Sequence, residues 1–182
     1  MKKIICILIL ANYILIGKTM SIDLTHHSRM NVSLTRDDIE KKVSNSLSTN
    51  KKLENSLKES KSKSVVNRSN KYLGIKYKWG GTSSSGMDCS GFVKRLYDEV
   101  GIKLPRVSKD QSLVGKDVSI KDIKYGDLMY FATKGGNRVS HVGVYLGNGE
   151  LIHASSSMGK IVRINLRGHK LLKQLIKIKR VI

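Results

Sequence analysis

Cysteine, aromatic side chains and acidic residues are all scarce in this chain of 182 residues. The two cysteines, Cys6 and Cys89, lie far apart and lack the paired spacing of a zinc site. Asp and Glu total 14 against 34 Lys and Arg, which gives a formal charge of +20. This charge favours an anionic partner such as nucleic acid, a membrane surface or a cell-envelope polymer, unless the lysines serve solubility alone.

A hydrophobic run long enough to span a membrane is also missing. The apolar stretch 4–16 follows two lysines and is shorter than the roughly 18 to 20 residues that a membrane-spanning helix needs. This pattern is typical of a secretory signal peptide, which we predict at residues 1–21. We therefore expect an exported protein, in the periplasm, the cell envelope or the medium. Removal of the signal peptide would leave Cys89 as the only thiol, in an oxidising compartment.

Residues 22–63 lack aromatic residues, glycine and proline and are rich in Ser, Asn and Lys. A segment with so little apolar surface cannot build a core, so we predict a basic, low-complexity tether. A weak helical spacing predicts that part of it is helical, with a partner-binding helix as the alternative. The residues with this spacing are Ile39, Val43, Leu47, Leu53 and Leu57. We place one folded domain at residues 64–182.

The stretch MDCSGFVKRLY, residues 87–97, predicts that Cys89 stands at the start of a helix. Apolar residues recur there at intervals of three and four, and Gly101 follows as a stop signal. Asp88 is a good N-cap, which leaves Cys89 in the first turn, where free N–H groups favour an anion. We therefore expect a thiol pKa below its usual value, unless Cys89 is simply a small buried side chain in a capped helix.

Two of the five histidines, His141 and His153, fall on alternating segments that predict a β-hairpin. A two-residue loop at Asn148 and Gly149 would put the two imidazoles on opposite faces. A three-residue loop over residues 147–149 would instead make them diagonal neighbours on one face. We predict the three-residue loop, because His141 could then act as a base that His153 orients.

Six motifs together resemble the NlpC/P60 family, the papain-like cysteine peptidases of the bacterial cell wall. They are YKWGG (77–81), DCSGF (88–92), PRVSKDQ (105–111), GDLMYF (126–131), SHVGVYLGNG (140–149) and LIHA (151–154). Their order and spacing are similar to those of the family over residues 64–182. The resemblance implies an α+β fold in which N-terminal helices pack on an antiparallel β-sheet.

The resemblance also implies roles for individual residues. Cys89 matches the nucleophile, His141 the general base, His153 the residue that orients the imidazole, and Tyr77 the donor near the oxyanion. Four further positions match residues around the substrate, namely Asp88, Ser90, Trp79 and Arg106. For Asp88 the helix cap is a competing role, and for Arg106 the competing role is shaping the rim of the cleft. No metal or other cofactor is expected, and a zinc site of Cys89, His141 and His153 is the alternative.

The implied reaction is hydrolysis of peptidoglycan stem peptides, with the γ-D-glutamyl–diamino acid bond as the family's usual target. The expected partners are peptidoglycan peptides, with anionic envelope polymers as a further candidate, and neither nucleic acid nor a second subunit is expected. The alternatives are an amidase or acyltransferase, a wall-binding or adhesion protein that kept the fold, and a secreted antibacterial toxin. A further alternative is that the basic, apolar end of the chain, residues 171–182, touches a membrane.

Overall fold

The computed structural model describes residues 35–182. The predicted signal peptide, residues 1–21, lies outside this range, as do residues 22–34 of the predicted tether. The chain divides into two units, 1–43 and 44–182. Of the first unit the structure describes only the start of a helix, and the second unit carries all the other elements. Within the described range no helix is sufficiently long and apolar to span a membrane.

Helix α2, Arg36–Ser69, occupies the described part of the predicted tether. Thr35 and Asp38 form a capping box, in which the backbone N–H of each bonds to the side chain of the other at 3.2 Å. Pairs four residues apart, such as Glu54 with Lys58, support the exposed turns. The predicted boundary between residues 63 and 64 falls inside this continuous helix.

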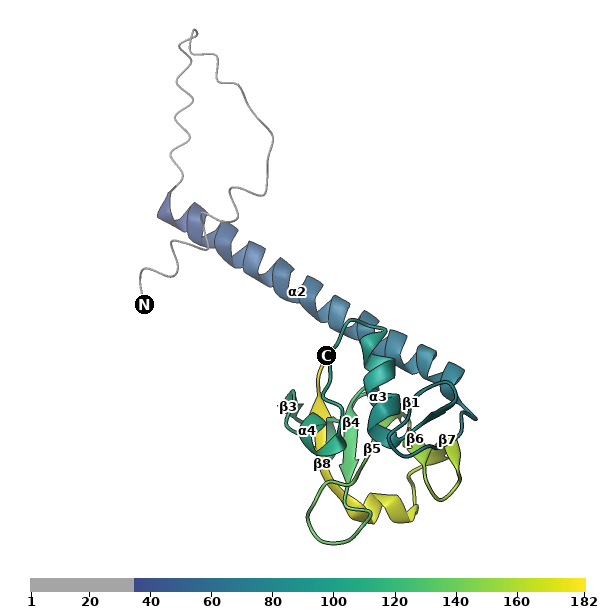
Figure 1. Ribbon diagram of the computed structural model, residues 1–182. Helices are drawn as coiled ribbons and strands as arrows, with labels where there is room; N and C mark the ends of the chain where they lie inside the picture. Colours follow the sequence, from purple (N-terminus) through teal and green to yellow (C-terminus); the bar gives the residue numbers. More distant parts are fainter. Residues whose placement is uncertain (1–34) are drawn as a thin grey trace. The chain divides into compact units, whose positions relative to one another are not determined.

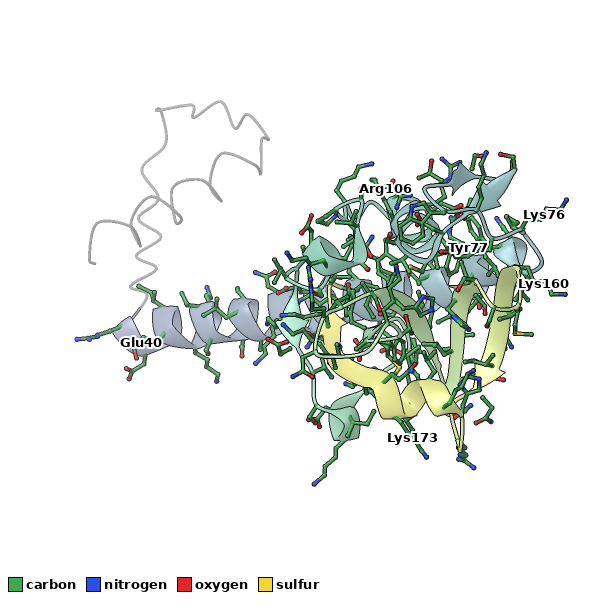
Figure 2. All side chains as sticks on the ribbon, turned by 60° about the horizontal axis from the view of Figure 1, so that its bottom comes forward. Glu40, Lys76, Tyr77, Arg106, Lys160 and Lys173 are labelled. Atoms are coloured by element: carbon green, nitrogen blue, oxygen red, sulfur yellow. The ribbon has the colours of Figure 1, made fainter. Side chains whose placement is uncertain are left out.

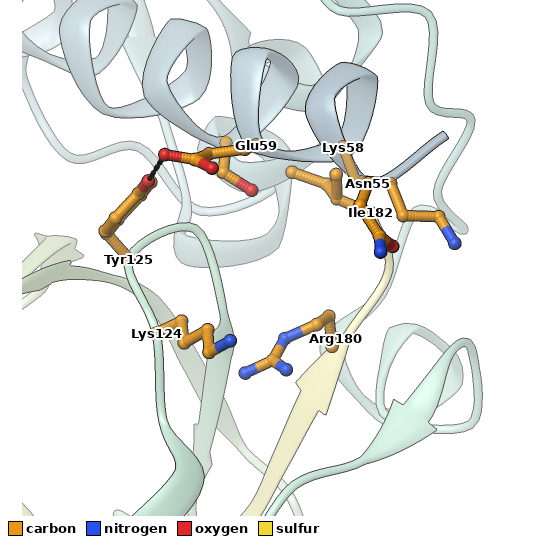
Figure 3. Close-up of a pocket in the computed structure, with 8 residues that line it drawn as sticks. Asn55, Lys58, Glu59, Lys124, Tyr125, Arg180 and Ile182 are labelled. Atoms are coloured by element: carbon orange, nitrogen blue, oxygen red, sulfur yellow. Dashed lines mark hydrogen bonds between the residues drawn. The ribbon is translucent and has the colours of Figure 1, made fainter. Parts of the chain in front are cut away.

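The C-terminal half of α2 is joined to the rest of the second unit by buried and polar contacts. Val65 is fully buried in the main core, and Arg68 pairs with Glu99 at 3.0 Å. Tyr125 donates a hydrogen bond to Glu59 at 3.2 Å (Figure 3). A cavity of about 660 Å³ lies among α2, the turn at Lys124 and Tyr125, and the end of the chain (Figure 3).

A six-stranded antiparallel sheet with the order β3-β8-β4-β5-β6-β7 forms the centre of the second unit (Figure 1). Its strands are β3 Lys116–Asp117, β4 Leu128–Phe131, β5 His141–Gly147, β6 Glu150–Ser155, β7 Lys160–Asn165 and β8 Leu175–Arg180. A two-stranded ribbon joins β1 Thr82–Ser83 to β2 Gly86–Met87. The helices are α3 Cys89–Asp98 and α4 Ser108–Gln111, with 3-10 turns η1 Asn70–Tyr72, η2 Ile120–Asp122 and η3 Lys170–Gln174.

Strand alternation produces a hydrophobic cluster on each face of the sheet. Leu128 and Tyr130 of β4 pack with α3, whereas Met129 and Phe131 of the same strand pack with Ile178 and Leu171. All four β4 residues are fully buried, as expected of a central strand that is covered on both faces. The predicted α+β fold, with helices on an antiparallel sheet, is confirmed.

The β5–β6 hairpin has the predicted register but not the predicted loop. Gly147 pairs with Glu150, so the loop has two residues, and Asn148 and Gly149 adopt positive φ angles of 53° and 80°. The register then shifts between Tyr145 and Gly147, and Val144 pairs with Ile152. The prediction of a three-residue loop was therefore wrong. A β-bulge in β5 supplies the extra residue that sets the predicted register.

The last strand accounts for the basic, apolar end of the chain. β8 lies between β3 and β4, and its Ile178 is buried in the second hydrophobic cluster. Arg180 donates two hydrogen bonds to the buried Asp127, at 2.8 and 2.7 Å. Ile178 thus helps to form the core of the domain, and Lys179 and Arg180 are paired with Asp117 and Asp127.

Candidate active site

Cys89 is the first residue of α3, as predicted, and Asp88 is its N-cap. The Asp88 side chain accepts a hydrogen bond from the Gly91 N–H at 2.7 Å, which satisfies one of the orphan donors of the first turn. Gly91 is required here because a Cβ would come within 2.2 Å of the Gly81 carbonyl oxygen. The cap and this close approach fix the start of the helix and hence the position of Cys89.

Asp88 is also the centre of a polar cluster with Ser90 and Arg106. Arg106 forms a bidentate pair with the two carboxylate oxygens, at 3.0 and 2.6 Å, and donates to Ser90 Oγ at 3.0 Å. The Gly80 N–H donates to the same carboxylate at 2.9 Å. The structure thus brings Asp88, Ser90 and Arg106 together in one cluster, while their contact with substrate, which the family resemblance implies, stays a prediction.

Gln111 links the loop that carries Arg106 to α3. Its side-chain amide donates to the carbonyl oxygens of Ser90, at 3.0 Å, and Pro105, at 2.9 Å. Gln111 is fully buried, so these bonds connect α3 to the loop inside the protein. They keep the Arg106 guanidinium beside Asp88.

Tyr77 lies on the segment that precedes α3, and backbone contacts hold this segment against the start of β7. Its backbone N–H donates to the Gly159 carbonyl at 2.7 Å, and the preceding Lys76 pairs with Lys160 (Figure 2). Burial, the Cys89 thiol and the Asp88 carboxylate together raise the pKa of Tyr77. The phenol therefore stays protonated at neutral pH and can donate a hydrogen bond beside Cys89.

His141 and His153 meet in the geometry that the hairpin register predicts. His141 Nε2 lies 2.7 Å from His153 Nδ1, and the two rings are nearly perpendicular, at 85°. Both side chains are buried. Because this bond uses Nε2, His141 Nδ1 is the ring nitrogen left to meet a thiol. His153 is thus placed to orient the His141 ring.

The Cys89 sulfur lies beside the first residues of β5, the strand that carries His141. The backbone N–H groups of Val142, Ser90 and Cys89 surround the sulfur and favour its anion. Val142 directly follows His141 in β5, and its side chain packs in the cluster that contains α3. Both Cys89 and His141 are among the described residues, and the structure shows no hydrogen bond between the Cys89 thiol and the His141 ring.

The direction of the thiol pKa differs from the sequence-based expectation. Burial, followed by the nearby Asp88 carboxylate, raises the pKa of Cys89, and these effects outweigh the N–H groups at the helix start. Burial lowers the pKa of His141 to about 4. Burial and the neighbouring imidazoles lower that of His153 to about 3. The free protein therefore favours the neutral thiol and neutral imidazoles.

Two cavities adjoin this site. One, of about 350 Å³, contains Cys89 together with Asp88, Arg106 and Trp79. Trp79 is 76% exposed and stands at the rim, where the Lys134 ammonium lies 5.0 Å from its ring centroid. The other cavity, of about 460 Å³, borders His141 and His153 and is also lined by Lys134. Lys134 lines only this second cavity and contacts Trp79 at the rim of the first.

Sequence reasoning missed the residues around the second cavity, notably Lys134, His169 and Lys170. Lysine is frequent throughout this chain, so no pattern distinguishes these two lysines, and His169 lies outside the motifs quoted above. Within residues 35–182 no group of three or more His, Cys, Asp and Glu side chains is arranged to hold a metal ion.

The sequence of this chain is similar to those of known proteins. The NlpC/P60 family matches residues 74–180. The Escherichia coli K12 protein named murein DD-endopeptidase MepS/murein LD-carboxypeptidase is 41% identical over 92 residues, which are 50% of this chain and 48% of that protein. The Bacillus subtilis 168 γ-D-glutamyl-L-lysine dipeptidyl-peptidase is 43% identical over 94 residues, covering 51% of this chain and 31% of that protein. The chain thus spans about half or less of the length of these relatives.

A solved structure supports the same assignment. The crystal structure of an NlpC/P60 family protein from Bacillus cereus ATCC 10987 matches with a TM-score of 0.62 and 34% identity. The match covers 66% of this chain and 40% of that one. The residues that the family matches, 74–180, contain Cys89, His141 and His153 and all six strands of the central sheet. The chain belongs to the NlpC/P60 family.

Proposed function

We propose that this protein is an exported cysteine peptidase that hydrolyses the stem peptides of peptidoglycan. One observation carries the proposal. Cys89 stands at the start of α3 against β5, where His141 is hydrogen-bonded to His153, in a chain whose relatives are named as murein and γ-glutamyl peptidases. A wall-binding protein would not need residues of these three types, which match a nucleophile, a base and an orienting residue.

In the proposed reaction His141 Nδ1 takes the proton of the Cys89 thiol, and the thiolate attacks the amide carbonyl carbon. The oxyanion accepts hydrogen bonds from the Cys89 N–H, an orphan donor of the first turn, and from the Tyr77 hydroxyl. His141 then protonates the leaving amine, and water hydrolyses the thioester. His153 holds the His141 ring through the 2.7 Å contact and favours the required tautomer.

The bond that we propose is the one between γ-D-glutamate and the diamino acid. The Bacillus subtilis relative is named for a γ-D-glutamyl-L-lysine linkage, which supports this choice. The Escherichia coli relative is named for DD-endopeptidase and LD-carboxypeptidase activities, so relatives of similar identity differ in the bond they cleave. The test must therefore identify products as well as measure the rate.

The full chain, purified beside three variants, is incubated with muropeptides, and the products are identified by mass spectrometry. Cys89→Ala and His141→Ala should each lower the rate at least about 10⁴-fold, since both remove groups that act as one unit. Cys6→Ala is the matched thiol control and should retain the rate. Equal product formation by the wild type, Cys89→Ala and His141→Ala would refute the proposed chemistry.

Export and wall attachment form the remaining part of this proposal. The predicted signal peptide at residues 1–21 supports export, and the charge of +20 supports attraction to anionic envelope polymers. Attraction between exposed charges is screened by salt. The protein bound to isolated cell walls should thus be released between low salt and about 0.5 M NaCl, where the Debye length is well below 10 Å. Retention that salt does not change would contradict the polymer attachment.

A further inference from the structure

The histidine cavity, which is the cavity that borders His141 and His153, is cationic. It measures about 460 Å³, within the range of small-ligand sites, and no Asp or Glu lines it. Lys134 comes from the loop before β5, and Lys170 and His169 come from η3 and its cap. Among the residues the structure describes, neither lysine forms a salt bridge with a carboxylate. This wall of the site is therefore open to an anion.

Hydrogen-bond donors add to the positive charge. His153 accepts through Nδ1 when His141 donates through Nε2, so His153 Nε2 carries a hydrogen. Ser156 and Ser157 contribute exposed hydroxyl groups to the same cavity. A carboxylate accepts hydrogen bonds only and is best bound by charged donors. The cavity thus matches a carboxylate better than an amine or an apolar side chain.

The position of the cavity identifies the part of the substrate that would fill it. In the proposed reaction His141 gives its proton to the leaving amine, so the leaving fragment lies on the histidine side of the sulfur. The acyl fragment then lies on the other side, in the cavity of Cys89, Asp88 and Trp79. Lys134 stands over the Trp79 ring at 5.0 Å and also lines the histidine cavity, so one extended peptide could occupy both.

We propose that the histidine cavity binds the leaving fragment of the stem peptide and that Lys134 and Lys170 recognise a carboxylate on it. This inference rests on the proposed function and names its substrate class: peptides that end in a free carboxylate shortly after the cleaved bond. A peptide whose carboxylate is amidated, or consumed in a crosslink, lacks the group that these lysines bind.

The electrostatics of the histidine pair agree with this role. Burial and neighbouring imidazoles lower the pKa of His153, and burial lowers that of His141, so the empty site disfavours the imidazolium that the reaction requires. The groups facing the pair from other elements are Lys134, Lys170 and His169, and none is acidic. A bound carboxylate would supply the missing negative charge and favour proton transfer from Cys89 to His141.

The test compares two substrates, a stem tetrapeptide with a free C-terminal carboxylate and the same peptide with a C-terminal amide. The full chain should cleave the acid with a kcat/KM about tenfold above that of the amide, the effect of one charge-assisted contact. In the double variant Lys134→Gln, Lys170→Gln this ratio should fall to about one. Lys173→Gln is the control, because Lys173 lies in the same η3 turn (Figure 2) and does not line the cavity, and this variant should keep the wild-type ratio.

Other results would overturn the inference in recognisable ways. A wild-type ratio near one, or a ratio that the double variant does not change, refutes carboxylate recognition while leaving the peptidase itself intact. Failure of the wild type to cleave either peptide refutes the proposed function instead. Calorimetry of the Cys89→Ala chain with the released diamino acid–D-alanine fragment then measures binding to the cavity separately from cleavage. If Lys134→Gln and Lys170→Gln together do not weaken this binding, the cavity is not the site of the leaving fragment.

Discussion

The carboxylate of Asp88 and the imidazole pair of His141 and His153 lie on two sides of one active site, and their polar surroundings differ. Asp88 receives hydrogen bonds from Arg106, Ser90, Gly80 and Gly91, so its oxygens are occupied by the protein. On the histidine side the pair is bonded to itself, and the lysines around it have no acidic partner among the described residues. One side is internally neutralised, and the other carries unbalanced positive charge.

The difference separates groups that build the site from groups that remain available to a ligand. The Arg106 pair holds the carboxylate of Asp88 in its charged form and lowers its pKa despite burial. That carboxylate caps α3, and through the cap it fixes Cys89. Charged side chains that satisfy each other stabilise the position of a catalytic residue, whereas cations without an anion attract one from outside. The comparison predicts that mutations on the two sides will affect different properties.

Arg106→Ala should destabilise the fold more than Lys134→Gln or Lys170→Gln at the histidine cavity. The substitution leaves the Asp88 carboxylate, which is only 10% exposed, without its cation. Removing one partner of a buried ion pair costs several kcal/mol in the free energy of unfolding. Because Arg106 itself is 35% exposed, the expected loss in the free energy of unfolding is at the lower end, about 3 kcal/mol. Urea denaturation at pH 7 measures it.

Arg138→Ala is the matched control for this prediction, since Arg138 is exposed and has no carboxylate partner among the described residues. Its free energy of unfolding should stay within about 0.5 kcal/mol of the wild type. If Arg106→Ala were no less stable than Arg138→Ala, the Asp88 cluster would not hold the start of α3, and the contrast between the two sides would fail.

The sequence predicted the capped helix on the Asp88 side because the determinants of that helix are local. Asp88, Cys89 and the apolar spacing after them specify a capped helix within a dozen residues, and the structure shows that helix. The hairpin was harder, since a two-residue loop with a bulge gives the same register as a three-residue loop. The alternation of the strands shows which face a residue takes but not which device sets the register.

The contact between His141 and His153 followed from the predicted register, but the pKa values on this side and the residues around the pair could not be predicted, because they depend on tertiary packing. Burial reverses the direction expected for the thiol pKa and lowers the pKa of both imidazoles, and burial is decided by elements far apart in the sequence. His169 and Lys170 meet the pair only because η3 precedes β8, which packs beside β4 in the sheet. Nothing in the local sequence marks them as part of a site.

The buried histidine pair should make the fold sensitive to mild acid. The pKa of His153 is about 3 in the folded protein against 6.5 for an ordinary histidine, so below pH 6.5 the unfolded chain binds more protons. Folding stability from this residue is therefore fully present at pH 7 and is lost as the pH falls toward 3. The linkage relation gives a loss of about 2 kcal/mol between pH 7 and pH 5 for His153 alone.

His153→Gln removes this titration, so its free energy of unfolding should fall about 2 kcal/mol less than that of the wild type between pH 7 and pH 5. Urea denaturation of both proteins at the two pH values gives the difference, and carboxylates common to both cancel from it. The substitution can lower stability at both pH values without affecting this comparison. An identical pH dependence in the two proteins would show that His153 is not held neutral in the folded state. The positive charge on the histidine side would then already be balanced within the protein, as the charge of Asp88 is on the other side.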